Sequence, residues 1–216
     1  MIELYTASTP NGQKIHIMLE ECGLAYTEHF LSLDKGDQFE PAFLKINPNG
    51  ELPALVDDDL VLWESNAILV YACEKLANKA AYPDDPKIRA DIHRWHLWES
   101  SKWFGACYVY LVENVVKPIL DDKADPAVLE AAGPNFHKLA GILEDRLEGR
   151  QWLSSDDVTI ADIAVAAPMH LHVFQKLPLE NYPNLRGWME RIEALPCWKK
   201  SDVAPHLSPE ILAKLM

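Results

Sequence analysis

The sequence predicts a small α/β domain with a mixed sheet, followed by an all-α helical domain, and three observations lead to this fold class. Strand-like and helix-like segments alternate before about residue 80, whereas nearly everything after it has helical periodicity. Residues 79–86 carry two prolines and two aspartates, a composition typical of a linker. The 216 residues suffice for two domains with cores of their own. We therefore predict domains at residues 1–78 and 87–216, joined by residues 79–86.

The first domain is predicted to run β-α-β-α-β-β-α. Between the first two strand-like segments, apolar residues recur at helical spacing until Gly23, a residue typical of a helix C-terminus. The expected elements are a strand at 2–6, a helix ending at 22, strands at 26–33, 53–56 and 60–63, a short helix at 39–44, and a helix at 65–76. A β-α-β unit favours parallel strands, and a hairpin around the three aspartates at 57–59 adds antiparallel ones. The pattern fits a small mixed sheet with helices on both faces.

The second domain is predicted to be a helical bundle. The expected helices span residues 87–116, 126–147, 184–195 and a short tail at 206–216, with one more opening at Thr159. Thr159 and Asp162 have the spacing of a capping box in which Asp replaces Glu. Pro118, Gly149 and Pro196 follow three of these segments and are expected to end them.

Composition excludes several classes of protein. The apolar and charged fractions, 49% and 25%, are those of an ordinary globular protein. Twenty basic against 33 acidic residues give a net charge of -13, which argues against a nucleic-acid partner. No apolar stretch approaches the roughly 20 residues that span a membrane, and the first residues lack the basic start of a signal peptide. We therefore expect a cytoplasmic protein with no membrane partner.

Metal and dithiol chemistry are not expected. The four cysteines lie far apart in the sequence without a C-x-x-C pair, and we predict free, mostly buried thiols. His93 and His96 are three residues apart, and His170 and His172 two apart, but neither pair has the accompanying acids or cysteines of a metal site. Surface or packing histidines are the simpler interpretation.

The first long helix is rich in aromatic residues. They are Trp95, Trp98, Trp103, Phe104 and Tyr108. Their spacing does not form one tight stripe, so some are expected to face away from the core. Core packing is nevertheless the first interpretation for each of them.

Ser8, Thr9 and Asn11 mark a first candidate site. They join a strand to a helix N-terminus, where free amides and the helix dipole favour an anion. Hydroxyl and amide donors there stabilise a thiolate and lower the thiol pKa. The same residue types are also ordinary helix caps, so capping alone is an open alternative.

Two further segments form possible ligand sites. Residues 47–53 hold two prolines and a glycine, and a cis bond before Pro53 would expose the main chain of Leu52 to a peptide ligand. Ser65 is a candidate helix N-cap whose hydroxyl and neighbouring amides can bind a carboxylate, with Glu64 beside it to accept from an ammonium group. An ordinary loop and a simple cap are the competing interpretations.

Taken together, the first loop, residues 47–53 and the pair Glu64 and Ser65 support a functional interpretation that none of them supports alone. The loop at 47–53, followed by Glu64 and Ser65 and then by the linker, resembles the glutathione-binding signature of the cytosolic glutathione transferase superfamily. Thr159 to Asp162 matches the capping box of a central helix in that family's helical domain. The resemblance covers the whole chain.

The resemblance implies a thioredoxin-like N-terminal domain that binds glutathione as co-substrate. By position, Leu52 binds the cysteinyl backbone ahead of a cis Pro53, and Glu64 and Ser65 hold the γ-glutamyl head. Gln38 matches a polar position that contacts the glycyl end in bacterial members.

The first loop is similar to that of bacterial Nu-class members, where the threonine and asparagine serve the sulfur. This points to Thr9 and Asn11 as catalytic residues, with Ser8 as a rival donor. The chain departs from the Nu pattern because residues 127–137 contain no arginine. It departs from the Omega and Beta patterns because the first loop has no cysteine. The transferase class therefore stays open.

The resemblance implies a bacterial-type detoxification enzyme, a homodimer, that activates glutathione as thiolate. The thiolate would attack a small hydrophobic electrophile or a disulfide. Two alternatives stay open. One is a glutathione-dependent disulfide-bond reductase, and the other is a non-catalytic transferase-like interaction module.

Overall fold

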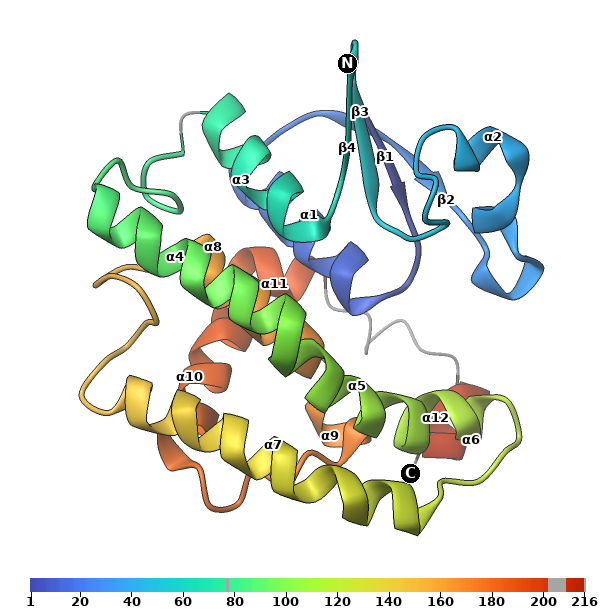
Figure 1. Cartoon of the computed structure of the whole chain (residues 1–216), viewed down its shortest axis with the longest axis vertical. Helices are drawn as coiled ribbons and strands as arrows, with labels where there is room; N and C mark the ends of the chain where they lie inside the picture. Colours follow the sequence, from blue (N-terminus) through green and yellow to red (C-terminus); the bar gives the residue numbers. More distant parts are fainter. Residues whose placement is uncertain (77, 202–208, 216) are drawn as a thin grey trace.

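A computed structural model describes residues 1–76, 78–201 and 209–215, and it places a β/α part beside a larger helical part (Figure 1). The four-stranded sheet has the order β2-β1-β3-β4. Its strands are β1 (Ile2–Thr6), β2 (Tyr26–Phe30), β3 (Ala54–Asp57) and β4 (Leu60–Trp63). β1 pairs with β2 in parallel, and β3 pairs antiparallel with both β1 and β4. The predicted mixed sheet is confirmed.

Helices cover both faces of the sheet. α1 (Pro10–Cys22) and α3 (Ser65–Lys75) pack against each other on one face, while α2 (Pro41–Leu44) lies on the other (Figure 1). The alternation along β1 explains this, because Ile2 and Leu4 are buried under α1 and α3. Tyr5 points the opposite way, and its ring centroid lies 5.9 Å from that of Phe43 in α2.

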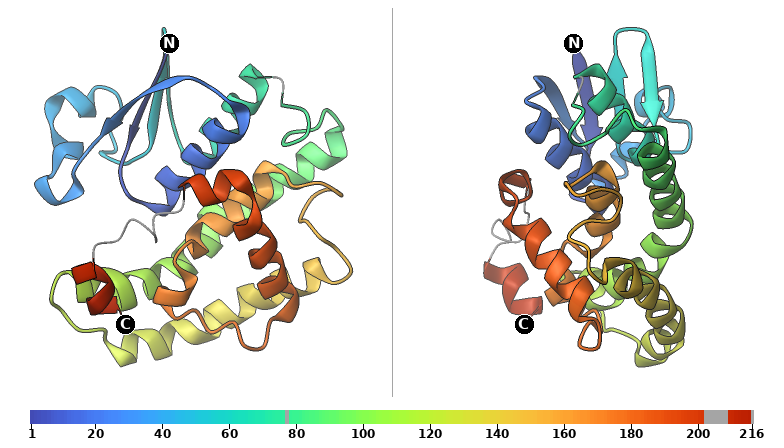
Figure 2. Two further views of the ribbon diagram at one scale, coloured as in Figure 1. Left: turned by 180° about the vertical axis from the view of Figure 1, so that it is seen from behind. Right: turned by 90° about the vertical axis from the view of Figure 1, so that its left-hand side faces the viewer.

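The helical part is built on two long antiparallel stretches (Figure 2). The first is helical without a break from Pro86 to Ile119, with π-helical turns at Glu99–Trp103 and Val112–Val116. Among the residues that the structure describes, the α-helices of this part are α4 (Pro86–Trp98), α5 (Phe104–Leu111), α6 (Lys117–Ile119), α7 (Pro126–Leu147), α8 (Ile160–Ala166), α9 (His172–Gln175), α10 (Pro183–Ala194), α11 (Pro196–Ser201) and α12 (Pro209–Leu215).

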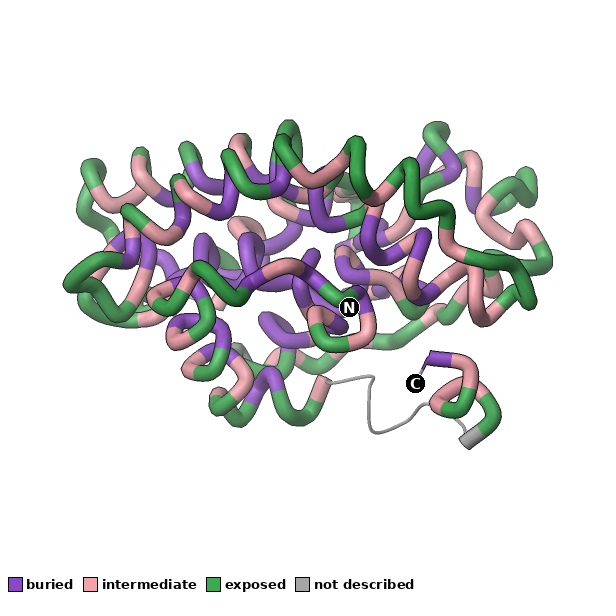
Figure 3. The backbone as a smooth tube through the Cα atoms, turned by 90° about the horizontal axis from the view of Figure 1, so that it is seen from below, coloured by how far each residue is buried: buried purple, intermediate pink, exposed green. Residues whose placement is uncertain are grey.

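One apolar core runs through both parts, and the buried stretches of the backbone meet in the middle of the molecule (Figure 3). Trp95 and Trp103 belong to it, and the Trp103 indole N–H donates to the Val165 carbonyl at 3.0 Å. Trp98 is partly buried and stacks on Trp103. Core packing is therefore confirmed for Trp95, Trp98 and Trp103. Tyr108 is exposed, in line with the expectation that some of these aromatic residues face away from the core.

Several predicted boundaries were wrong. The second strand ends at Phe30 rather than residue 33, because a 3₁₀ turn (Leu33–Lys35) follows it. The helix predicted at 39–44 is a 3₁₀ turn (Asp37–Phe39) and α2, separated by extended backbone at Glu40. By contrast, the first long helix passes Pro118 by only one residue and ends at Ile119, close to where this proline was expected to end it.

Two short helices, α9 and α11, were not predicted from the sequence. α9 has four residues and α11 has six, too few for a periodic pattern. α10 begins one residue before the prediction and ends at Ala194. Of the predicted tail helix, α12 accounts for residues 209–215, and residues 206–208 and 216 lie outside the described part.

The structure also bears on the thiols. Cys73, Cys107 and Cys197 are buried thiols, as predicted. Within the ranges listed above, no three metal-ligating side chains gather at one place. None of the described helices is both long and apolar enough to cross a membrane.

Candidate functional site

Five of the eight predicted site residues line one small pocket, although they come from three separate segments. The pocket measures about 40 Å³ and is lined by Asn11, Asn47, Asn49, Glu51, Leu52, Pro53, Trp63, Glu64 and Ser65. The pairing of β3 with β1 and β4 explains the convergence, because it brings the loop before β3 and the turn after β4 to the N-terminal end of α1. Ser8, Thr9 and Gln38 lie outside the lining.

The N-terminus of α1 forms one wall. Thr9 is the N-cap, and its Oγ1 accepts from the Gly12 N–H at 3.1 Å. Capping is thus a real role of Thr9, but the hydroxyl proton remains available for donation. Ser8 is exposed. Within the described ranges, neither the main-chain N–H nor the Nδ2 of Asn11 forms a hydrogen bond, so this helix end presents unpaired donors.

The loop before β3 forms the second wall and is held by Asn47. This buried side chain donates to the Glu51 carbonyl at 2.7 Å and accepts from the Asn49 N–H at 3.1 Å. The Leu52–Pro53 peptide bond is cis, as the sequence suggested. Among the described residues, the N–H and C=O of Leu52 form no hydrogen bond. They are available to a ligand that pairs like an added strand.

Gln38 lies beside this loop, on the far side of Gly50. Gly50 has φ +66°, and a Cβ there would lie 2.9 Å from the Phe39 ring and 3.4 Å from the Gln38 carbonyl. Glycine is therefore required both for its conformation and for this close approach. The Gln38 Oε1 is buried without a partner in the described part of the chain.

The start of α3 forms the third wall. Glu64, not Ser65, is the N-cap residue, so the predicted capping role of Ser65 was wrong. Glu64 adopts φ +74°, a conformation that costs a non-glycine residue energy and that clusters at functional sites. Ser65 is the first helical residue, and its hydroxyl donates to Asn11 Oδ1 at 3.3 Å. The N–H groups of Ser65 and Asn66 have no partner within the described ranges.

A buried ion pair lies behind these walls and joins the two parts of the molecule. Lys14 in α1 and Glu99 are 3.3 Å apart, at 0% and 1% side-chain exposure. Asn66 completes the cluster: its Oδ1 accepts from Lys14 Nζ, and its Nδ2 donates to Glu99 Oε2 at 2.8 Å. Burial lowers the pKa of Lys14, and the charges of Glu99 and Glu64 oppose the shift. No sequence pattern indicates this cluster, because Asn66 is 52 residues from Lys14 and 33 residues from Glu99.

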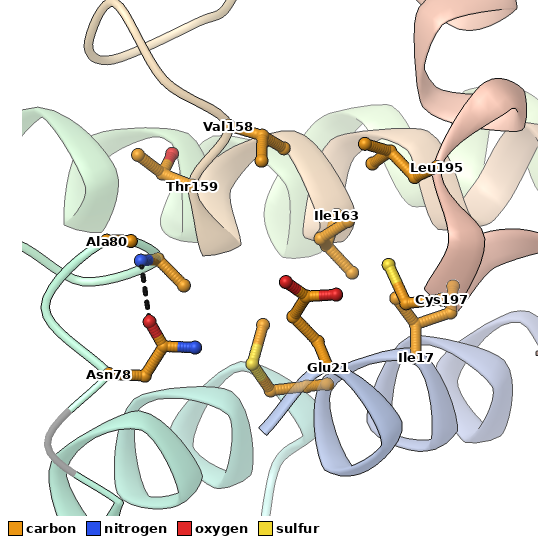
Figure 4. Close-up of a pocket in the computed structure, with 11 residues that line it drawn as sticks. Ile17, Glu21, Asn78, Ala80, Val158, Thr159, Ile163, Leu195 and Cys197 are labelled. Atoms are coloured by element: carbon orange, nitrogen blue, oxygen red, sulfur yellow. Dashed lines mark hydrogen bonds between the residues drawn. The ribbon is translucent and has the colours of Figure 1, made fainter. Parts of the chain in front are cut away.

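A second cavity, of about 60 Å³, lies between α1, residues 78–81, α8 and α11 (Figure 4). Its lining is mainly apolar, and none of the eight predicted site residues contributes to it. The Cys197 sulfur and the Glu21 carboxylate point into it. Burial, and then the charge of Glu21, raise the pKa of Cys197 to about 12, so this thiol is protonated at neutral pH. We interpret the cavity as a packing gap between the two parts.

Comparison with known proteins agrees with this geometry. Residues 1–74 match the model of the glutathione S-transferase N-terminal domain, and residues 110–196 match that of the C-terminal domain. The disulfide-bond oxidoreductase YfcG of Escherichia coli is 34% identical, over 97% of this chain and 98% of its own. The chain belongs to the glutathione S-transferase family. The glutathione S-transferase GstB of E. coli is 31% identical, over 92% and 95% of the two chains.

Solved glutathione transferases share the fold. A family member from Pseudomonas fluorescens, solved with two glutathione molecules bound, superposes with a TM-score of 0.79 at 30% identity, covering 93% of this chain and 91% of its own. The glutathione transferase fold accounts for both parts of the molecule, a thioredoxin-like domain with a mixed sheet and a helical domain.

Proposed function

We propose that this glutathione transferase binds glutathione in the pocket between α1, β3 and α3 and activates it as thiolate. The observation that carries the proposal is the convergence of Asn11, Leu52 and Ser65 on one pocket from positions far apart in sequence. Each of them presents polar groups that lack a full set of partners. A tripeptide with a zwitterionic head, a central main chain and a thiol is complementary to such a surface.

Each end of the tripeptide has a proposed partner. The γ-glutamyl carboxylate meets the free amides at the start of α3, and its ammonium group meets Glu64 and Ser65. The cysteinyl main chain pairs with Leu52, beside the cis Pro53. Gln38 is proposed for the glycyl carboxylate, next to Gly50. Thr9 and Asn11 then face the sulfur, with Ser8 as the rival donor.

These donors can supply the energy that thiol activation requires. A free thiol with a pKa of about 8.5 is only a few per cent thiolate at neutral pH. Lowering that pKa by about two units needs roughly 2.7 kcal/mol of preferential stabilisation. Hydrogen bonds from Thr9 and Asn11 to a charged sulfur, together with the N-terminus of α1, are of this order.

The thiolate sulfur then attacks an electrophile. With a small hydrophobic halide, the sulfur–carbon bond forms as the carbon–halogen bond breaks, and halide leaves with the electron pair. With a disulfide, the thiolate attacks one sulfur and the other leaves as a thiolate that takes a proton from water. The similarity to YfcG, named a disulfide-bond oxidoreductase, supports keeping the reductase as the second candidate. We propose a cytoplasmic, bacterial-type detoxification enzyme with the domain limits predicted above.

The test is a titration of the bound thiol by ultraviolet absorbance in the wild type and in Thr9→Ala, Asn11→Ala and Ser8→Ala. We expect a bound thiol pKa near 6.5, about two units below that of free glutathione, and a rise in the variant that loses the responsible donor. Ser155→Ala is the matched control, because its hydroxyl bonds locally, donating to the Asp157 carbonyl and accepting from the Asp157 N–H. A bound pKa equal to that of free glutathione in every protein would sink the proposed site.

A non-catalytic module is separated from an enzyme by two assays on the same protein. Retention on immobilised glutathione measures binding, and turnover with a nitroaromatic halide and with a glutathione mixed disulfide measures reaction. Retention with turnover of the halide supports the transferase, and turnover of the disulfide alone supports the reductase. Retention without either turnover supports the module.

A homodimer completes the proposal. Large apolar side chains are exposed on β4, α4 and α5, among them Trp63, Leu97 and Tyr108. Such residues mark surfaces that a partner can cover, and closed two-fold dimers are the commonest oligomers. Sedimentation velocity tests this, because a single species at the monomer mass of 24.4 kDa would contradict it.

A further inference from the structure

A hollow lined by two arginines lies between the C-terminal end of α7 and α10, which pack against each other (Figure 1). It measures about 260 Å³, and its described lining residues are all different from those of the proposed glutathione pocket. Arg150, in the turn after α7, and Arg191, in α10, bring two guanidinium groups to it, and none of its described lining residues is acidic. In a chain with 33 acidic and 20 basic residues, this arginine hollow is a local excess of positive charge that favours an anion.

Arg191 is held in place, and one edge of its guanidinium group is left open. Its Nε and Nη2 donate to the Gln151 carbonyl at 3.3 and 3.1 Å, and its Cζ lies 5.9 Å from the centroid of the Trp152 ring. Its Nη1 has no partner within the described ranges and lies beside Gly187, where a Cβ would be 3.6 Å away. A side chain that is already ordered loses little conformational entropy when it binds a ligand. Arg191 is therefore preorganised to donate from Nη1.

Arg150 is exposed, and its guanidinium group has no hydrogen-bond or ion-pair partner in the part of the chain that the structure describes. Its main-chain N–H donates to the Leu147 carbonyl at 3.0 Å and so holds the turn. Burial lowers the pKa of the nearby Arg146, and the charge of Asp91 opposes this shift. The charges of Arg150 and Arg94 add to it, so like charges gather at this end of α7. A bound anion would relieve that repulsion.

The simplest alternative is that these arginines only stabilise the end of α7. Basic side chains near a helix C-terminus interact favourably with its dipole and donate to nearby carbonyls. This accounts for Arg146, whose Nε donates to the Leu153 carbonyl at 2.8 Å, and for the inner edge of Arg191. It accounts neither for Arg150 nor for the open Nη1 of Arg191. Hydration alone gives no reason for two guanidinium groups, which repel each other, to line one hollow without an acid.

The N-terminus of α10 is not the source of the site. The N–H groups of Asn184 and Leu185 already donate to the Glu144 carboxylate, at 3.0 and 2.9 Å. An anion in the arginine hollow would therefore be bound by arginine side chains, and substitution of those side chains tests the site directly.

We propose that Arg150 and Arg191 bind a phosphate group, either of inorganic phosphate or of a small phosphate monoester. One guanidinium group donates two parallel N–H bonds, which satisfy both oxygens of a carboxylate. A phosphate group has further oxygens and additional charge for a second arginine. The hollow leaves room beyond one tetrahedral ion, and Leu147 and Pro183 contribute apolar surface on which the organic part of a monoester can lie. This site does not depend on the proposed function.

The experiment is calorimetric titration of the whole protein with inorganic phosphate, at an ionic strength kept constant with chloride. We expect saturable binding with a dissociation constant of about 1 mM. Arg150→Gln and Arg191→Gln should each weaken binding about tenfold or more, because each removes charge-assisted hydrogen bonds. Arg150→Lys, which keeps the charge but loses the planar fork, should fall between Arg150→Gln and the wild type. Arg186→Gln is the matched control, because it removes the same charge from α10 but its side chain lines a different hollow.

Two further ligands identify the source of the phosphate group. Phenyl phosphate that binds more tightly than inorganic phosphate would support a monoester, and equal affinities would support inorganic phosphate. Acetate should bind about tenfold more weakly than phosphate, because it has no oxygens for the second arginine. Acetate binding as tight as that of phosphate would overturn the assignment to phosphate.

The remaining outcomes decide whether the site exists. If phosphate produces neither binding heat nor a rise in melting temperature over chloride at equal ionic strength, the proposal is overturned. Equal losses of affinity in Arg150→Gln and Arg186→Gln would overturn it as well, because net charge alone would then govern binding. Arg191 also holds the Gln151 carbonyl, so Arg191→Gln can disturb the fold. Arg150 is exposed and holds nothing through its side chain in the described ranges, so an unchanged affinity in Arg150→Gln is by itself sufficient to contradict the proposal.

Discussion

Among the described helices, α1 and α8 both begin with a threonine N-cap, but the first turns of the two helices are satisfied differently. At α8, the third helical residue is Asp162, whose carboxylate accepts from the Thr159 N–H, the Thr159 hydroxyl, the Leu153 N–H and the Trp188 indole N–H. At α1, the third helical residue is Gly12, which has no side chain to reach back. The acid closes one helix end inside the core, and the glycine leaves the other open.

The difference teaches how a structural motif and a binding site are distinguished. Both ends have the residue types that cap a helix, so the caps alone do not separate them. The separation comes from the remaining amides. At α8 the Ile160 N–H donates to the carbonyl of the distant Ala81 at 3.0 Å. At α1 the Asn11 N–H has no partner within the described ranges, and Asn11 lines the pocket. Gly12 is also needed for space, because a Cβ there would lie 2.5 Å from the Ala7 carbonyl oxygen.

The largest expected effect on the free energy of unfolding is at the N-terminus of α8, which Asp162 closes. Asp162→Ala should lower the free energy of unfolding by about 3–5 kcal/mol, because it leaves several buried donors without an acceptor. Urea unfolding, followed by tryptophan fluorescence, measures the change. Asp162→Asn, which keeps one oxygen, should lose less. A loss below about 1 kcal/mol in the alanine variant would show that burial of the carboxylate, which raises its pKa, offsets most of what its hydrogen bonds contribute.

The two ends also differ in how far the sequence reveals them. The capping box at α8 is visible because Thr159 and Asp162 are three residues apart, and the structure confirms it. The segments of the proposed site are visible as well, but their convergence follows from the observed strand order β2-β1-β3-β4, which the sequence did not predict. The Lys14–Glu99 pair and the Ser65–Asn11 bond are not visible, because both join residues more than 50 positions apart. No local pattern specifies such contacts. They arise from the packing of α1 against α3 and from the contact of α1 with the π-helical turn that begins at Glu99.

An intermediate effect is expected when a side chain is added at Gly12, in the first turn of α1. Gly12→Ala should destabilise the protein by about 1–3 kcal/mol, because the new methyl group meets main-chain oxygen that cannot move aside alone. It should also weaken retention on immobilised glutathione, since the amides of α1 would shift. Gly141→Ala in α7 is the matched control: its Cβ meets nothing within 4 Å, and it should stabilise the helix by about 0.5–1 kcal/mol. Equal effects of the two substitutions would contradict a special role for Gly12.

The smallest expected effect is a dependence of the free energy of unfolding on pH, caused by a buried histidine beside the start of α8. His96 Nε2 lies 3.2 Å from the carbonyl of Ile160, the first residue of α8. Burial lowers the pKa of His96 from 6.5 to about 4, with smaller contributions in the same direction from Lys14 and His93. Between these values the unfolded chain binds the proton and the folded one does not, so stability falls as pH falls. From pH 8 to pH 6 the loss is about 1 kcal/mol for this residue.

The measurement is urea unfolding of the wild type and of His96→Gln at both pH values. The wild type should lose more than the variant between pH 8 and pH 6, by about that 1 kcal/mol. The variant should keep some dependence, because burial also lowers the pKa of His170 to about 4. Equal slopes in the two proteins would show that His96 is protonated in the folded state at pH 6. A charged imidazole buried beside the start of α8 requires water or a rearranged neighbour. The N-terminus of α8 would then not be the rigid, closed helix end that contrasts with the N-terminus of α1.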